Sequence, residues 1–155
     1  MRRISILSYY QSLHNHHRID DMKEREDRIR NSETTSLSYY RALKFNTPSI
    51  IYSSFMDDVK RSIITRWRLS NHRLKIELGR YQRPIIKRHE RLCDTCEVLD
   101  DEAHAIFFCS RFNHIRARNR DLLLRNDNVQ KFLNPSMGDK EKVASFLTDM
   151  EKVLI

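Results

Sequence analysis

Residues 93–109 read CDTCEVLDDEAHAIFFC, and this stretch decides how the chain folds. Cys93 and Cys96 are separated by two residues, His104 follows after seven more, and Cys109 after a further four. Two cysteines on one tight turn can present both sulfurs to a single ion, and a histidine and a cysteine on the next element can complete a tetrahedron. Zinc takes this ligand set with all four positions filled, which leaves no open position for a reactive water. The stretch therefore predicts one structural Zn2+.

Other interpretations of these residues stay open. The three cysteines can be free thiols beside a core histidine, or His89 or His114, just outside the stretch, can replace His104 as a ligand. An odd number of cysteines without a secretion signal argues against a disulfide framework. A structural zinc contributes on the order of 10 kcal/mol in zinc-finger peptides, so even a polar segment can fold around it.

Upstream of the metal stretch, residues 60–92 concentrate positive charge. This segment holds eleven Lys and Arg residues against only Glu77 and Glu90, whereas the whole chain has a net charge of +8. Basic side chains neutralise phosphates, and aromatic or imidazole rings can stack on unpaired bases. The segment therefore indicates binding to DNA or RNA, with a solvated helix face as the alternative. A membrane surface is disfavoured because the segment has no continuous apolar face. The predicted contact residues are Arg66, Arg68, His72, Arg73, Lys75, Arg80, Tyr81, Arg83, Lys87, Arg88 and Arg91.

The chain as a whole predicts a mainly α fold. We expect a helical, partly charged N-terminal arm at 1–46 and a zinc-binding helical domain at 47–155, which comprises the basic segment 60–92, the knuckle 93–109 and C-terminal helices in 110–155. The boundary rests on Pro48, which suits the first turn of a new helix and is disfavoured inside one.

Apolar residues at helical spacing predict which faces are buried. The expected stripes are Ile51, Phe55, Val59, Ile63 and Trp67 in one helix; Phe112, Ile115 and Leu122 in a helix from Ser110 to Leu124; and Val143, Phe146, Leu147, Met150 and Leu154 in a last helix capped by Asp139. Gly79 is expected to end a short segment between the first two helices.

The string Phe55-Met56-Asp57-Asp58 matches the aromatic-x-Asp-Asp signature of reverse transcriptases. In those enzymes the aspartates lie on a strand hairpin and hold two metal ions with a third carboxylate. The pattern around Asp57 and Asp58 is helical, so we interpret both as first-turn helix residues and expect no enzymatic activity.

Composition narrows the class of protein further. Hydrophobic residues make up 39% of the 155 residues and charged residues 32%, which suits a modest helical core rather than a large enzyme fold. With two glycines, no phosphate-cradling glycine loop can be written. No apolar run is long enough to span a membrane, and no signal peptide is recognisable, so we expect a nuclear or cytoplasmic protein that is not secreted.

The stretch from Arg68 to Arg116 resembles the C-terminal region of LINE-type (non-LTR) retrotransposon reverse transcriptases. The similarity lies in an R-x-S-x-H-x-L-x-x-E-x-G-R string at 68–80, the C-x2-C, the Asp101-Glu102-Ala103-His104 string, and Cys109 with the residues that follow it. Ser110 stands where that family usually has proline, which we expect to affect only the start of the following helix. The resemblance is specific over 68–116, plausible over 38–155 and unconvincing for 1–37.

The resemblance implies a CCHC zinc knuckle on a helical linker that grips DNA or RNA near a polymerase. The fingers, palm and endonuclease are missing, so a polymerase would have to be supplied by another chain. We therefore expect a zinc-dependent nucleic-acid-binding module. The alternatives are a zinc-stabilised protein-interaction scaffold that pairs through the stripe at 143–154, and a transposon remnant with no selected role.

Overall fold

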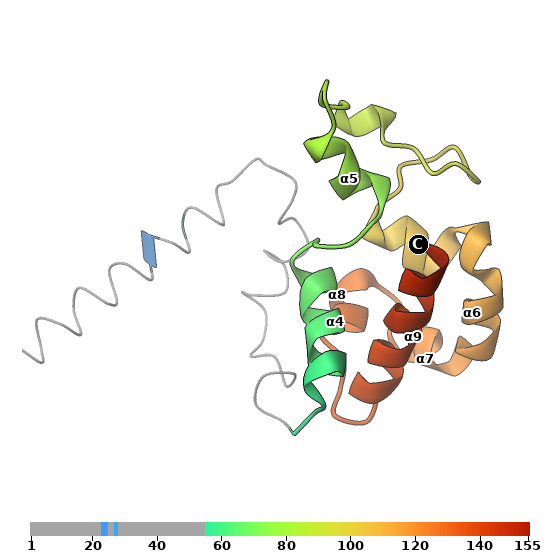
Figure 1. Ribbon diagram of the computed structural model, residues 1–155. Helices are drawn as coiled ribbons and strands as arrows, with labels where there is room; N and C mark the ends of the chain where they lie inside the picture. The colour runs from blue at the N-terminus through green and yellow to red at the C-terminus, as the bar shows by residue number, and fades with distance from the viewer. Residues whose placement is uncertain (1–22, 25–26, 28–54) are drawn as a thin grey trace, which may run out of the picture. The chain divides into compact units, whose positions relative to one another are not determined.

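The computed structural model describes residues 23–24, 27 and 55–155, and over 55–155 the chain is mainly helical (Figure 1). The helices are α4 (Asp58–Arg68), α5 (Lys75–Tyr81), α6 (Asn113–Arg118), α7 (Arg120–Arg125), α8 (Val129–Leu133) and α9 (Lys140–Val153), with 3-10 turns η2 (Arg88–Glu90) and η4 (Ser110–Phe112) and a π-helical turn η3 (His104–Phe108). Within 55–155 no strand forms, only a single antiparallel bridge between Leu92 and Leu99. The predicted mainly α class is confirmed.

The predicted arm at 1–46 lies outside the described residues except for residues 23, 24 and 27, and so does Ile51. The chain divides between Thr35 and Ser36 into two units, and the fold below belongs to the second. None of the helices among the described residues has both the length and the apolar character to cross a membrane.

Helix α4 begins at the string that matches the reverse-transcriptase signature. Asp57 is its N-cap, and the carboxylate accepts hydrogen bonds from the backbone N–H groups of Val59 and Lys60 at 3.0 and 3.2 Å. These bonds satisfy donors that a helix start otherwise leaves unpaired. Asp58 is the first helical residue, so the helical interpretation of this string is confirmed.

The core forms where α4 packs against α9 and α8 (Figure 1). Helix α4 buries Ile63, Ile64 and Trp67, and α9 buries four residues of its predicted stripe, namely Val143, Phe146, Leu147 and Met150. Phe132 of α8 packs edge-on against Phe146 with ring centroids 5.1 Å apart. The apolar face of α9 is therefore the centre of the domain.

The stripe predicted for α4 is wrong at its N-terminal end. Phe55 is 98% exposed and Val59 77% exposed, whereas Met56 is buried. Phe55 precedes the helix, and steps of four residues rotate by about 40° each, so Val59 lies about 80° around α4 from Trp67. Only the later residues of the stripe face α9.

The link from α4 to α5 is a Schellman turn with a serine where glycine is usual. Ser70 has φ 54°, its N–H bonds the carbonyl of Trp67, and the N–H of Asn71 bonds the carbonyl of Arg66. Helix α5 then runs through Gly79 to Tyr81, so the expectation that Gly79 ends this segment is wrong.

The helix predicted from Ser110 to Leu124 is interrupted. Its inward residues Phe112, Ile115 and Leu122 are buried as predicted, but η4, α6 and α7 replace one continuous helix. The break falls at Asn119, whose side-chain amide bonds the carbonyl of Ile115 at 2.9 Å. Asp139 occupies the N-cap of α9 without making a side-chain cap bond, because its carboxylate binds Arg125 instead.

Candidate metal centre and its basic surroundings

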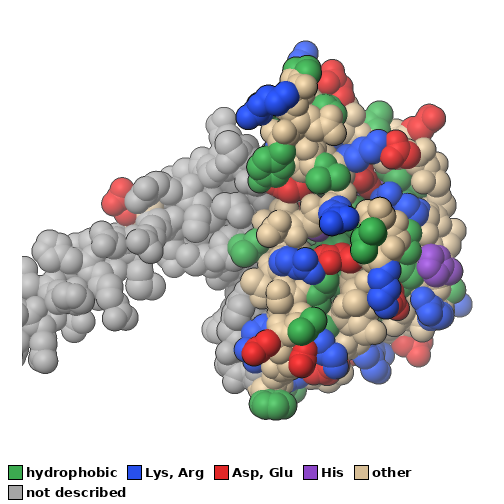
Figure 2. Space-filling view, in the orientation of Figure 1, with side chains coloured by type: hydrophobic (Ala, Val, Ile, Leu, Met, Phe, Trp, Pro, Cys, Tyr) green, Lys and Arg blue, Asp and Glu red, His purple; other side chains and the backbone are tan. Residues whose placement is uncertain are grey.

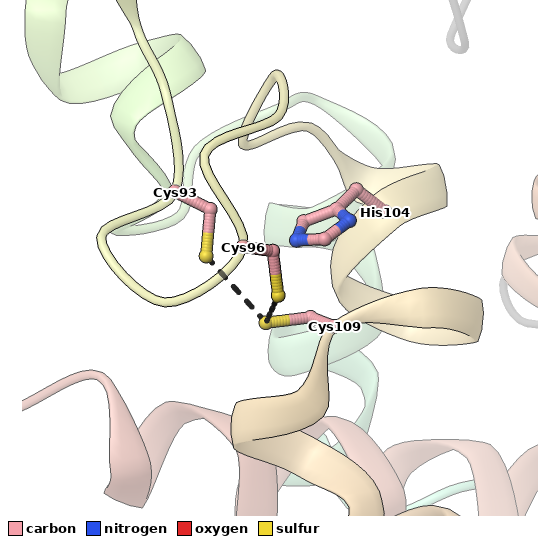
Figure 3. A group of neighbouring side chains, drawn as sticks. All are labelled: Cys93, Cys96, His104 and Cys109. Carbon is pink, nitrogen blue, oxygen red and sulfur yellow. Dashed lines mark hydrogen bonds between the residues drawn. The ribbon is translucent and has the colours of Figure 1, made fainter.

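The four predicted ligands form one cluster (Figure 3). The ligand atoms of Cys93, Cys96, His104 and Cys109 all lie within 4.8 Å of one another. Cys93 and Cys96 come from the loop before η3, His104 opens η3, and Cys109 follows it. The cluster can hold one metal ion, and the predicted ligand set is brought together in full.

The sulfur separations match a shared ion. Cys93 Sγ lies 3.6 Å and Cys96 Sγ 3.9 Å from Cys109 Sγ. A tetrahedral ion with metal–sulfur bonds of about 2.3 Å sets two sulfurs about 3.8 Å apart. A disulfide would need about 2.05 Å, and all three cysteines are free.

The imidazole of His104 is aimed at the sulfurs (Figure 3). Its Nε2 is buried and has no hydrogen-bond partner in the structure. A buried polar atom without a partner is costly, and coordination to a cation removes that cost. Burial also lowers the pKa of His104, which keeps the ring in the neutral form that binds metals.

The π-helical turn explains how ligands five residues apart meet. The N–H of Cys109 bonds the carbonyl of His104 at 2.7 Å, an i to i+5 bond. In an α-helix these positions lie about 140° apart around the axis, so their side chains diverge. The wider turn of η3 brings both onto one side, in keeping with the frequent occurrence of π turns at functional sites.

The loop that carries Cys93 and Cys96 is a tight turn closed by the Leu92–Leu99 bridge. The N–H of Cys93 bonds the carbonyl of Val98 at 2.8 Å, and the N–H of Glu97 bonds the carbonyl of Cys93 at 2.9 Å. Glu97 adopts φ 57°, a left-handed conformation unfavourable for a residue with a side chain. The turn holds both sulfurs on one side of the loop.

The thiols differ in their ease of ionisation. Burial raises the pKa of Cys109 to about 11, with the Cys93 sulfur adding to the effect. A hydrogen bond with Ser110 lowers the pKa of Cys96, and the Ser110 oxygen lies 3.3 Å from its sulfur. Ser110, which begins η4, therefore also contacts the candidate ligand Cys96, while the four predicted ligands still come together. The position of Ser110 directly after Cys109 in the sequence was the signal that could have predicted this contact.

Three consecutive acidic residues each fix one part of the site. Asp100 accepts the backbone N–H of Lys75 at 2.8 Å and so caps α5. Asp101 accepts the backbone N–H of His104 at 2.9 Å and orients the ligand turn. Asp100 thereby ties the knuckle to α5.

Glu102, the third, lies in the interior and binds two residues of the predicted R-x-S-x-H string. Its Oε1 accepts the Ser70 hydroxyl at 2.7 Å and lies 2.9 Å from Nε2 of His72. Burial alone would raise the pKa of Glu102, but these hydrogen bonds and the His72 charge together hold the pKa below its usual value. The string therefore joins the end of α4 to the metal turn.

The two rival ligands lie away from the cluster. His89 is exposed and sits 3.6 Å from Glu90, and His114 is exposed on α6. Neither belongs to the group of ligand atoms that includes Cys93.

Three of the predicted nucleic-acid contacts are buried, which is a correction. Arg68 bonds the Leu133 carbonyl at 3.1 Å, and Arg91 donates to the carbonyls of Ile76 and Ile86 at 2.7–3.0 Å. His72 contacts Trp67, with ring centroids 4.8 Å apart, besides Glu102. These side chains hold the fold together and cannot reach a phosphate or a base.

The remaining predicted contacts fall into two groups. Three cations are held by carboxylates: Arg66 by Glu151, Lys75 by Asp94 and Arg80 by Glu77. Five residues are exposed and, in the described part of the chain, make no ion pair: Arg73, Tyr81, Arg83, Lys87 and Arg88. All but Arg73 lie between the end of α5 and the end of η2. Figure 2 shows Lys and Arg side chains on the part of the surface formed by α5 and η2, and also over α6 and α7.

Comparison of the chain with protein-family models, curated proteins and solved structures finds no match.

Proposed function

We propose that this chain is a zinc-stabilised nucleic-acid-binding module. The observation that carries the proposal is the juxtaposition of a closed Cys3His cluster with an adjoining segment whose exposed cations make no ion pair within residues 55–155.

Zinc is the ion best suited to the cluster. Three thiolates and one imidazole are the ligands of structural zinc sites, and the sulfur separations of 3.6 and 3.9 Å agree with its bond lengths. Carboxylates lie near the cluster, but Asp101 is already engaged by the His104 backbone. Four protein ligands complete the shell, so we assign the ion a structural role and no catalytic one.

The exposed segment from Tyr81 to Arg88 supplies the nucleic-acid surface. Arg83, Lys87 and Arg88 extend into solvent, where they can neutralise phosphates and release counterions. Tyr81 is 76% exposed and can stack on an unpaired base. Arg73 adds a fourth cation next to the start of α5.

The resemblance to the tail of LINE-type reverse transcriptases supports the same function. Its motif residues divide into separate roles here: Cys93, Cys96, His104 and Cys109 form the cluster. Ser70 and His72 bind Glu102 beside the metal turn, and Arg68 bonds the Leu133 carbonyl. We propose that the chain acts as such a tail, without polymerase or endonuclease activity, in the nucleus. Asp57 is consistent with this absence of catalysis, since its carboxylate is used to cap α4.

The protein-interaction scaffold would need the stripe at 143–154 as an exposed surface, but most of this stripe is buried. Four residues of its stripe, Val143, Phe146, Leu147 and Met150, are at most 1% exposed because they pack against α4 and its neighbours.

Metal content tests the first half of the proposal. Elemental analysis of untagged protein should give one zinc per chain, and Cys96→Ala should lose it. His114→Ala is the matched control and should keep the full zinc content. Substoichiometric zinc in the wild type, or retention in Cys96→Ala, would contradict the assignment.

A salt titration tests the second half. Affinity for a single-stranded oligonucleotide should fall steeply with salt, and each of Arg83→Gln and Arg88→Gln should reduce the slope of log affinity against log salt by roughly 0.7–0.9. Lys152→Gln is the control, because Lys152 is exposed but paired with Asp149. Wild-type affinity that does not respond to salt would refute the function.

A further inference from the structure

A second cationic site lies outside the segment 60–92, in a cleft formed by α6, α7 and the start of α9. The cleft has a volume of about 460 Å³. Four cations line it, namely Arg118, Arg120, Arg125 and Lys142, and Asp121 is the one acidic residue among its lining residues. Gathering like charges around one cavity is unfavourable unless carboxylates of the protein or a bound anion neutralise them.

The cations of this cleft are only partly neutralised. Arg125 pairs with Asp139 at 2.8 Å, and Arg118 lies 3.7 Å from Asp149, which also binds Lys152. In residues 55–155, Arg120 and Lys142 have no carboxylate within ion-pair distance. Two cations therefore remain available to a ligand.

An apolar groove adjoins the cleft and shares Arg120 and Ala117 with it. The groove has a volume of about 520 Å³ and is lined by Phe107, Phe108, Leu123 and Leu124 among others. Phe108 is 73% exposed although it directly precedes the ligand Cys109. An exposed aromatic ring next to unpaired cations is the combination that binds single-stranded nucleic acid.

We propose that the α6–α7 face binds a single nucleic-acid strand, with phosphates in the cationic cleft and a base stacked on Phe108. This inference rests on the proposed function and adds a second contact surface to it. Arg120 connects the two parts because it lines both. A duplex is disfavoured since its bases are stacked internally and cannot reach the ring, and a free phosphate would not use the groove.

The test uses the full-length zinc-loaded chain and a fluorescent oligothymidylate, with a DNA duplex of equal length for comparison. Phe108→Ala should weaken binding to the single strand about five-fold or more without changing the salt slope, and should leave duplex binding unchanged. Arg120→Gln should reduce the salt slope by about 0.7. Phe55→Ala and Lys60→Gln are the matched controls. Phe55 is an exposed ring and Lys60 an exposed cation paired with Glu141, both outside the cleft and the groove, and both variants should bind like the wild type.

The outcomes separate this inference from the proposed function. If Arg83→Gln and Arg88→Gln weaken binding while Phe108→Ala and Arg120→Gln do not, the α6–α7 site is wrong and the proposed function stands. If Arg120→Gln alone matters, and inorganic pyrophosphate competes equally with the strand, the cleft is a site for free phosphates and the strand proposal is wrong. If wild-type binding is insensitive to salt, both fail. Circular dichroism of every variant checks the fold.

Discussion

Gly79 sits inside α5 because the side chain of Arg91 crosses it. A Cβ at this position would lie 2.8 Å from Cδ and Nε of Arg91, which is held by hydrogen bonds to two backbone carbonyls. Alanine favours a helix over glycine by about 1 kcal/mol, but overpacking against a fixed side chain costs more, about 1–3 kcal/mol. We expect Gly79→Ala to lower the free energy of unfolding by about 1 kcal/mol in urea titration.

Gly138 provides the control for this prediction. A Cβ there meets no atom within 4 Å, so Gly138→Ala should be neutral or slightly stabilising. A Gly79→Ala variant as stable as Gly138→Ala would show that Arg91 can move aside.

Glu102 is the buried partner of Ser70 and His72. Glu102→Ala leaves both polar groups unsatisfied in the interior, so we expect a loss of about 3 kcal/mol in the free energy of unfolding. Glu141→Ala is the matched control: Glu141 pairs with Lys60 at the surface, and such pairs contribute at most about 1 kcal/mol. The measurement is urea unfolding at constant free zinc, and equal losses in the two variants would contradict the structural role of Glu102.

At the scale of single residues, the role of a side chain could be predicted from the sequence only where its partners lie close to it along the chain. The candidate ligands were predictable because Cys93, Cys96, His104 and Cys109 lie within one short stretch, and their spacing is typical of a zinc site. The burial of Arg68 and His72 was not, because their partners Leu133 and Glu102 lie 65 and 30 residues away. An arginine in a basic segment looks the same in sequence whether it faces solvent or a buried carbonyl.

The pairing of α4 with α9 is the element-scale interaction on which the core depends. Trp67 is fully buried there, and its indole N–H bonds Glu151 at 3.2 Å. Trp67→Ala should lower the free energy of unfolding by about 3–5 kcal/mol. Phe55→Ala, an exposed aromatic at the other end of the predicted stripe, should change it by less than about 0.5 kcal/mol. Thermal and urea unfolding measure both variants. Similar losses of stability would mean that Phe55 is buried together with Trp67, as the sequence predicted.

The buried faces of the helices were predicted better than the residues at which the helices begin and end. Phe112, Ile115 and Leu122 are buried as expected, because periodicity reports which side chains face inward. The break at Asn119 was missed since an asparagine is compatible with a helix, and the break is fixed by its own bond to the Ile115 carbonyl. The π turn of η3 was missed for a similar reason: its role is visible only once the side chains of His104 and Cys109 are found in one cluster.

For the whole molecule, the proposed metal would link the loop after α5, which carries Cys93 and Cys96, to the turn before α6, which carries His104 and Cys109. Loading this site is coupled to protons because thiols bind metals as thiolates. Free thiols titrate near pH 8.5, and burial raises the pKa of Cys109 to about 11, so this sulfur carries a proton in the metal-free chain at neutral pH. His104 contributes no proton near neutrality, because burial lowers its pKa and the ring is already neutral.

Zinc binding at pH 7 should therefore release at least the Cys109 proton for each ion bound, and the affinity should rise with pH by at least about one power of ten per unit. The sign follows from the ligands: protons and zinc compete for the same sulfurs, so lowering the pH removes the metal and the stability that it contributes. Calorimetry in two buffers with different ionisation enthalpies counts the protons, and competition with a chelator from pH 6 to 8 measures the slope. Ser110→Ala is the control, because it removes the hydroxyl that lowers the pKa of Cys96 while leaving every ligand in place, so the proton count should not fall. Release of no proton would mean that the Cys109 sulfur is already ionised without the metal, in conflict with its burial.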